Sequence, residues 1–133
     1  MKAPVYILEL PEPTPSNNSI RGQHYRVYAA TRRRWRQLVL AALNGRAPES
    51  PLPLARLEID RYSVGSLDWD NALGGLKPLL DCLVMPPARN PNGLGLVADD
   101  NPRAMPQAPV MRQLPAKRGQ GRTVVRIYSA EAC

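Results

Sequence analysis

Two hydrophobic patterns alternate along this chain, and their order limits what the chain can fold into. Apolar and polar residues alternate, as in half-buried strands, over residues 4–10, 54–62 and 123–129, with shorter strand candidates at 94–98 and 110–114. Apolar residues recur at helical spacing over 31–43 and 77–84. Strands and helices in this order predict a compact α+β fold, with a mixed sheet of three to five strands and two main helices.

The chain has 133 residues, enough for one domain with a modest core and too few for two. Residues 1–133 are therefore expected to form a single domain, in which 101–122 is a basic loop that is mobile without DNA. Apolar stretches last only a few residues, far below the roughly 20 that span a bilayer, and the N-terminus lacks a signal-peptide pattern. These features predict a cytoplasmic protein whose Cys82 and Cys133 are reduced thiols.

Charge is gathered into blocks of opposite sign. Residues 19–61 contain nine basic side chains, and 103–126 contain six with no acidic ones. Between these blocks, five of the six aspartates lie from Asp68 to Asp100, in a chain of net charge +7. A basic surface around an acidic centre suits a ligand with a phosphate backbone, although a single arginine run is more often a solvated face. The candidate DNA-binding residues are Arg32, Arg33, Arg36, Lys117, Arg118 and Arg122.

The acidic centre contains Asp68, Asp70, Asp99 and Asp100. Carboxylates gathered in one place repel one another unless a cation lies among them. Hard divalent cations prefer oxygen ligands, so the cluster favours Mg²⁺, with Mn²⁺ as a substitute. Aspartate is also common in turns, and turn chemistry is the competing interpretation.

The conformation of residues 68–71 decides what this motif can do. If the segment is extended, Asp68 and Asp70 project to one side and can share a metal, while Trp69 points into the core. Asn71 stands at the entry to a helical segment. Its amide either caps that helix or supplies an oxygen behind the metal ligands.

Other motifs fail on inspection. An EF-hand beginning at Asp68 requires glycine where Leu73 stands and glutamate where Leu79 stands. Gly93-x-Gly95-x-x-Ala98 resembles a dinucleotide fingerprint, but acidic residues and proline follow where a helix should begin. His24 is the only histidine, and a loop or ligand-facing role is favoured over a catalytic one.

The order of the remaining motifs is more specific than any one of them. Asp68-x-Asp70-Asn71 is followed by Lys77-x-x-x-Asp81 and by a short apolar segment that ends in Asp99-Asp100. This combination resembles the RusA-type Holliday junction resolvases, a family of crossover junction endodeoxyribonucleases. The opening strand with the proline-rich sequence after it, and the closing strand at 123–128, are also similar to the family.

The resemblance implies a function and a site. Family members are magnesium-dependent homodimers that nick two strands of a four-way DNA junction symmetrically, here in phage or prophage recombination and repair. A two-fold junction suits two active sites presented by a symmetric dimer. The implied catalytic residues are Asp68, Asp70, Asp100 and Lys77, and the implied metal ligands are the first three with Asp99 beside them.

The sequence departs from the family pattern in two segments, and the proposed function has two alternatives. The segment between Asn71 and Lys77 contains a Gly-Gly pair and is longer than in the shortest family members, and the loop at 85–92 is expanded with prolines. Lys77 either stabilises charge on the scissile phosphate or forms a salt bridge with Asp81, four residues further along one helix face. The alternative functions are a non-catalytic DNA-binding module of the same fold and a nuclease without junction preference.

Overall fold

The computed structural model describes residues 3–86 and 93–130. Its elements are β1 (Tyr6–Leu10), α1 (Asn17–Ile20), α2 (Tyr25–Ala42), β2 (Ala55–Ser63), α3 (Trp69–Gly74), α4 (Lys77–Leu83), β3 (Val110–Pro115) and β4 (Arg122–Ser129). The expectations for Cys133 and for most of the loop at 85–92 lie outside the described residues. No helix within the described ranges combines the length and the apolar character needed to cross a bilayer.

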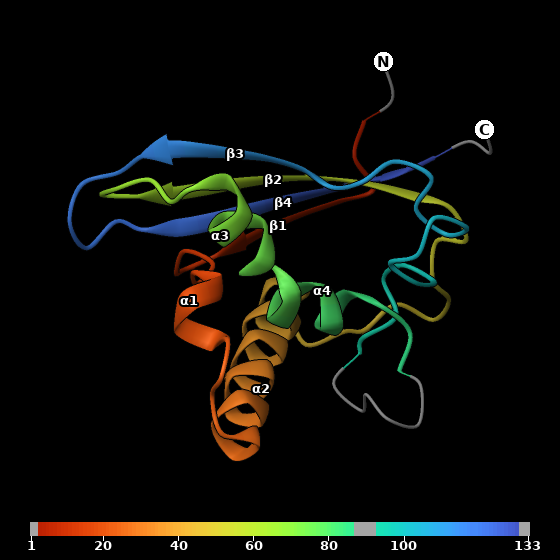
Figure 1. The fold of residues 1–133 in the computed structure, drawn as a ribbon. Coiled ribbons are helices and arrows are strands. Elements are labelled where there is room, and N and C mark those ends of the chain that lie inside the picture. The colour runs from red at the N-terminus through yellow and green to blue at the C-terminus, as the bar shows by residue number, and fades with distance from the viewer. Residues whose placement is uncertain (1–2, 87–92, 131–133) are drawn as a thin grey trace.

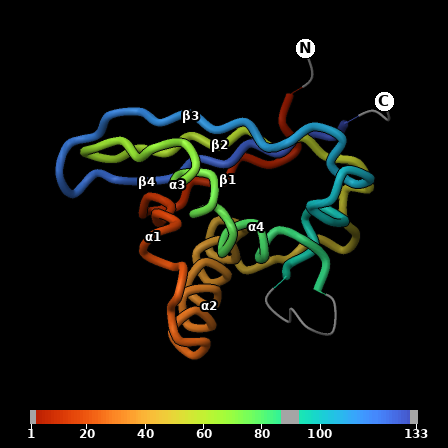
Figure 2. The backbone as a smooth tube through the Cα atoms, viewed as in Figure 1, coloured from red at the N-terminus to blue at the C-terminus, as the bar shows by residue number. Residues whose placement is uncertain are grey.

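The strands form one mixed sheet in the order β1-β4-β2-β3. β4 pairs antiparallel with β1 and with β2, whereas β2 pairs parallel with β3. The helices gather on one side of this sheet, and α2 projects away from it (Figure 1, Figure 2). The predicted α+β fold with a mixed sheet is therefore confirmed. β3 confirms the strand candidate at 110–114, which lies within the segment predicted to be a basic loop at 101–122.

The core lies between the helices and one face of the sheet. Successive strand side chains point to opposite faces, so every second residue of β2 and β4 is buried there. Leu57 and Ile59 of β2 are fully buried and stand opposite Ile127 and Val125 of β4. This alternation is the pattern from which both strands were predicted.

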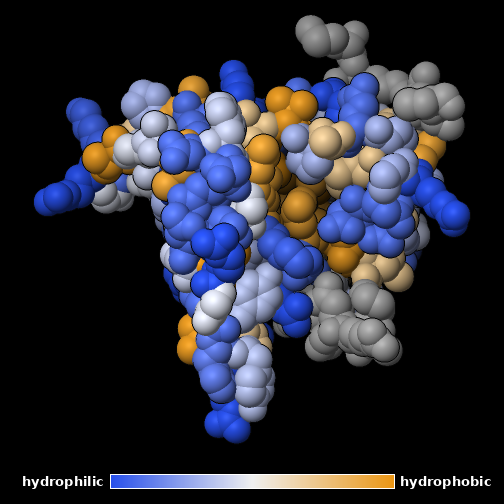
Figure 3. Space-filling view, viewed as in Figure 1, coloured by the Kyte–Doolittle hydropathy of each residue, from blue (hydrophilic) through white to orange (hydrophobic). Residues whose placement is uncertain are grey.

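α2 is longer than its hydrophobic pattern predicts. The pattern begins at Thr31, but the helix begins at Tyr25, with His24 as its N-cap accepting the backbone N–H of Arg26 at Nδ1 over 3.3 Å. This first part of the helix projects beyond the sheet, where burial imposes no apolar stripe, and its surface is mostly hydrophilic although Tyr25 and Val27 are exposed on it (Figure 1, Figure 3). Further along, Trp35 is only 2% exposed, which confirms its predicted place in the core.

The predicted strand at 94–98 is wrong, although the segment is buried as expected. Gly95 has a φ of 75°, which breaks the extended conformation, and only Val97 forms isolated bridges, to Leu52 and Val84. The backbone N–H of Leu96 instead donates to the carbonyl of Leu83 at 2.9 Å. The end of α4 therefore takes up the hydrogen bonds that a neighbouring strand would have supplied.

A close contact joins α1 to the Gly74-Gly75 pair between α3 and α4. A Cβ atom on Gly75 would overlap the carbonyl oxygen of Pro15, and a Cβ atom on Gly74 would lie 2.7 Å from Cγ of Asn17. Only glycine allows the backbone before α1 to approach this closely. The pair that lengthens the segment before Lys77 is thus a packing requirement of this chain.

Gly75→Ala is expected to lower the free energy of unfolding by about 2–3 kcal/mol, because the new methyl group has no space beside the Pro15 carbonyl. Urea unfolding measures the change. Gly65→Ala is the matched control, since no heavy atom lies within 4 Å of its added Cβ. The control should change stability by at most about 1 kcal/mol, in the stabilising direction. Equal stabilities of the two variants would contradict the close packing.

Candidate functional site

The aspartates of the 68–71 motif lie at the start of α3. Asp68 is the N-cap residue, and its side chain forms no hydrogen bond or ion pair within the described ranges. Asp70 lies in the first turn, where its Oδ1 accepts the backbone N–H of Asn71 at 2.9 Å. Both side chains are exposed. Neither carboxylate has a cationic partner in this part of the chain, so both can accept a cation or a hydrogen-bond donor from a ligand.

Trp69, between these aspartates, is exposed and not in the core. The prediction assumed an extended segment and is wrong, because Trp69 begins α3 and is 54% exposed. α3 buries Ala72 instead. Leu73, one helical turn after Trp69, is also exposed, at 46%. An apolar pair therefore borders the two carboxylates on the surface.

A side chain from the sheet holds the segment immediately before Asp68. Gln113 of β3 accepts the backbone N–H of Leu67 at 2.7 Å through Oε1 and donates to the Leu67 carbonyl at 2.8 Å through Nε2. These two bonds fix both backbone polar groups of the residue preceding Asp68. No local pattern in the sequence marks Gln113, because its partner Leu67 is 46 residues away.

Asn71 joins α3 to α1. Its Oδ1 accepts the backbone N–H of Asn18 at 2.8 Å, in the first turn of α1, where backbone N–H groups have no partner within the helix. The two roles predicted for Asn71 were a cap of its own helix and an oxygen behind the metal ligands. The structure shows a cap of a different helix, supplied across 53 residues of sequence.

Lys77 and Asp81 form the ion pair that was one of the two roles considered for the lysine. Lys77 Nζ lies 3.1 Å from Asp81 Oδ1, and Arg32 of α2 lies 3.5 Å from Asp81 Oδ2. The Asp81 side chain is only 11% exposed, whereas that of Lys77 is 63% exposed. Asp81 is therefore anchored between two cations while the lysine remains open to solvent.

Lys77 also interacts electrostatically with Asp100. Burial lowers the pKa of Lys77, but the hydrogen bond and charge of Asp81 outweigh it, with further contributions from Tyr28 and Asp100, so the pKa is raised. The ammonium group is consequently charged at neutral pH. Lys77 is thus paired with Asp81 and influenced by the charge of Asp100, whereas no hydrogen bond or ion pair joins it to Asp68 or Asp70 in the described part of the chain.

The two adjacent aspartates behave differently. Asp99 accepts the backbone N–H of Asp100 at 2.8 Å and the side-chain amide of Asn101 at 3.0 Å, so its carboxylate belongs to a local turn. Burial raises the pKa of Asp100, and the hydrogen bond and charge of Asp99 raise it further, while Lys77 lowers it. Asp100 is the member of the pair that interacts with Lys77.

The donor chemistry of these aspartates fits a hard divalent cation, because each offers exposed carboxylate oxygen. Their arrangement is less complete. Among residues 3–86 and 93–130, no three His, Cys, Asp or Glu side chains form a group that could hold a metal ion. A site built from Asp68, Asp70 and Asp100 requires them to come closer together, and their predicted role as ligands stays a prediction.

The candidate DNA-binding residues have unequal surroundings. Arg32 is largely buried against Asp81 and lies 5.5 Å from the ring centre of Tyr28, so its charge is already compensated. Arg122 lies over the ring of Tyr62 at 3.8 Å. Three of the candidates are exposed and form no side-chain hydrogen bond or ion pair in the described ranges: Arg33, Lys117 and Arg118. Arg36 is partly buried.

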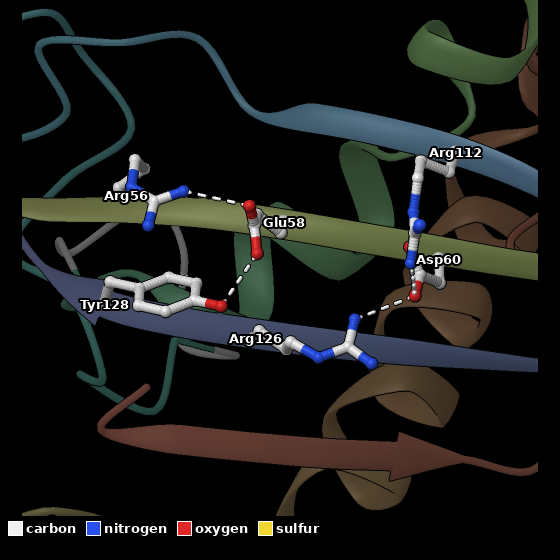
Figure 4. A network of polar contacts seen from close by, with 6 residues as sticks. All are labelled: Arg56, Glu58, Asp60, Arg112, Arg126 and Tyr128. Carbon is white, nitrogen blue, oxygen red and sulfur yellow. Dashed lines mark hydrogen bonds and ion pairs between the residues drawn. The ribbon is translucent and has the colours of Figure 1, made fainter. Parts of the chain in front are cut away.

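A second polar cluster lies on the sheet face away from the helices (Figure 4). Asp60, 1% exposed, accepts hydrogen bonds from Arg112 at 2.7 and 2.8 Å and from Arg126 at 2.7 Å. Beside them, Glu58 pairs with Arg56 at 3.0 Å and with the Tyr128 hydroxyl at 2.8 Å. Each carboxylate already has two partners, which marks this cluster as a structural network.

A scan against protein-family models finds no match for this chain, and no curated protein matches it in sequence.

Gln113→Leu is expected to free the backbone before Asp68. Loss of both hydrogen bonds to Leu67 should lower the free energy of unfolding by about 1–2 kcal/mol and speed hydrogen exchange of the Leu67 amide about tenfold. NMR-detected exchange measures this. Gln107→Leu is the control, because Gln107 is exposed and has no hydrogen bond in the described ranges. Unchanged protection of Leu67 in the first variant would disprove the role of Gln113.

Asp60 is expected to make stability depend on pH. The Arg112 hydrogen bond lowers its pKa, burial opposes this, and Arg126 lowers it further, so the net shift is downward. The stabilisation is complete above the unfolded-state pKa of about 3.9 and is lost as pH falls through the lowered folded-state value. Asp60→Asn should therefore cost about 2–3 kcal/mol at pH 7 and progressively less below pH 4.

Urea unfolding of wild type and Asp60→Asn between pH 7 and pH 3 tests this dependence. Glu9→Gln is the control, since Glu9 is an exposed residue of β1 without a hydrogen bond or ion pair in the described ranges. A constant stability difference between wild type and Asp60→Asn across this range would refute the prediction.

Proposed function

We propose that this protein is a magnesium-dependent, structure-selective endodeoxyribonuclease that resolves four-way DNA junctions by paired phosphodiester hydrolysis. The proposal includes a homodimer, because two symmetric cuts need two sites. The observation that carries it is that the carboxylates of Asp68 and Asp70 are exposed and, within the described ranges, have no cationic partner. These are two of the residues on which the resemblance to RusA-type resolvases depends.

The local structure around the motif also supports the proposal. Gln113 fixes the backbone immediately before these two aspartates through its two hydrogen bonds to Leu67. Lys77 is charged and 63% exposed, and its ion pair with Asp81 orients it without burying it. A charged lysine at this place can stabilise the negative charge that develops on a phosphate during hydrolysis.

Asp68, Asp70 and Asp100, with Asp99 beside them, would hold the metal. A divalent ion supplies water activation and charge neutralisation for phosphodiester hydrolysis. The chain itself would contribute phosphate binding by Lys77 and backbone contacts from exposed basic residues such as Arg33, Lys117 and Arg118.

A non-catalytic DNA-binding module is the second candidate, and one observation favours it. No three acidic, histidine or cysteine side chains in the described ranges form a group that could hold a metal ion. A module of this kind would use Asp99 in its turn and Asp81 in its ion pairs, and it would bind junctions through the basic surface alone.

Asp70→Asn is expected to abolish junction cleavage while junction binding survives. The substitution removes one carboxylate charge, which should reduce the cleavage rate at least about a hundredfold, but leaves the basic surface intact. Cleavage of an end-labelled four-way junction with magnesium measures activity, and gel shift with EDTA measures binding. Glu49→Gln is the control, since Glu49 is exposed and unpaired within the described ranges.

The outcomes separate the candidates. Unchanged cleavage by Asp70→Asn would contradict the assignment of Asp70 to the catalytic site. Wild-type protein that binds junctions in a strongly salt-dependent way, but never nicks them with magnesium, is the DNA-binding module. Equal cleavage of junction and linear duplex would indicate a nuclease without junction preference.

A further inference from the structure

A cavity adjoins Lys77 on the side of α1 and α2. It has a volume of about 280 Å³ and is lined by Asn17, Ile20, Arg21, Tyr28, Gly74 and Lys77. This volume lies near the lower end of the range of small-molecule pockets, about 300 Å³. Because Lys77 lines the cavity and also interacts with Asp100, the cavity lies next to the candidate catalytic group.

The structure builds this cavity through contacts already described. The absent side chain of Gly74 leaves room beside Asn17, and the close contact of Gly75 with Pro15 sets the distance between α1 and α3. Tyr28 of α2 is partly buried, and the guanidinium of Arg32 lies 5.5 Å from its ring centre. Burial and the charge of Asp81 raise the pKa of Tyr28, so the ring is neutral at physiological pH.

The chemistry of the lining is that of a nucleotide site. Tyr28 and Ile20 offer an aromatic and an apolar surface on which a base can stack. Arg21 and Lys77 provide two positive charges, and the Arg21 side chain has no hydrogen bond or ion pair in the described part of the chain. The Asn17 amide can both donate to and accept from the edge of a base.

From this lining we infer that the cavity receives one unstacked nucleotide of the branched DNA, beside the phosphodiester to be cleaved. Its base would stack on Tyr28, and its phosphate would lie between Arg21 and Lys77. This inference rests on the nuclease function proposed above. It also gives a physical basis for structure selectivity, because unstacking a base costs least where pairing is already disrupted, as near a branch point.

The test is a scan of binding affinity with junctions that lack a single base. An abasic site is placed at each position around the branch point in turn, and dissociation constants are measured with EDTA, so no cleavage is needed. Wild-type protein should bind about 5- to 100-fold more weakly when the base that enters the cavity is missing. Tyr28→Ala should show no such position, whereas Tyr28→Phe, which keeps the ring, should show the wild-type profile.

Tyr25→Ala is the matched control, because Tyr25 is on the same helix, 68% exposed and not part of the cavity lining. It should retain the wild-type profile. Arg21→Gln provides a second variant that does not depend on the fit of the ring. It should weaken binding to every junction and lower the salt dependence by about one phosphate contact, in contrast to Arg46→Gln, an exposed arginine elsewhere.

Two results would overturn the inference and leave the nuclease function standing. One is a flat abasic profile for a wild-type protein that cleaves junctions, and the other is an unchanged profile in Tyr28→Ala. Failure of the proposed function looks different, because wild-type protein would then bind junctions without nicking them or cut junction and linear duplex equally, and the inference would fall with it.

Discussion

The contact between Gly75 and the Pro15 carbonyl controls how the helical side of this protein is assembled. It allows α1 to lie directly against the junction of α3 and α4, where Asn71 can cap α1 through Asn18. The same approach sets one wall of the cavity that Lys77 lines. The carboxylates at the start of α3, the lysine at the start of α4 and the cavity between the helices therefore share one packing constraint. A side chain at position 75 would disturb all three, although it would touch none of the charged groups.

The sheet contributes a side chain of β3 that holds the segment before α3. β3 lies beside β2 and runs parallel to it. This pairing places Gln113 beside Leu67, where the chain leaves β2 for α3. Asp68 is thus positioned through the preceding Leu67, whose backbone N–H and carbonyl both bond to the Gln113 side chain, 46 residues further along the chain. On its other face, the sheet holds Asp60 and Glu58 in paired networks, which separates structural carboxylates from the exposed ones at α3 (Figure 4). Carboxylates with satisfied partners have little capacity left for a ligand.

The ion pairs around Lys77 hold Asp81 in place and leave the lysine accessible to a ligand. Asp81 is nearly buried and held by both Lys77 and Arg32, whereas the lysine itself stays largely exposed. Because only the Asp81 end of the pair is buried, the pair orients the lysine without removing it from solvent. Arg32 illustrates the same division on α2, since it faces Asp81 and Tyr28 while its neighbour Arg33 is exposed. A run of arginines in the sequence therefore contains residues with different roles.

Hydrophobic periodicity alone determined the α+β class, β2, β4 and the half of α2 that packs on the core. A buried face repeats every two residues in a strand and every three to four residues in a helix, so the sequence shows it locally. The spacing of Lys77 and Asp81 indicated their ion pair as one of two roles for the lysine. Only tertiary structure decided that Trp69 is exposed, that Asn71 caps α1, and that 94–98 bonds to the end of α4 instead of forming a strand. These outcomes depend on partners distant in sequence. The role of Gly74-Gly75, visible in the sequence only as an insertion, became clear from the backbone that lies against it.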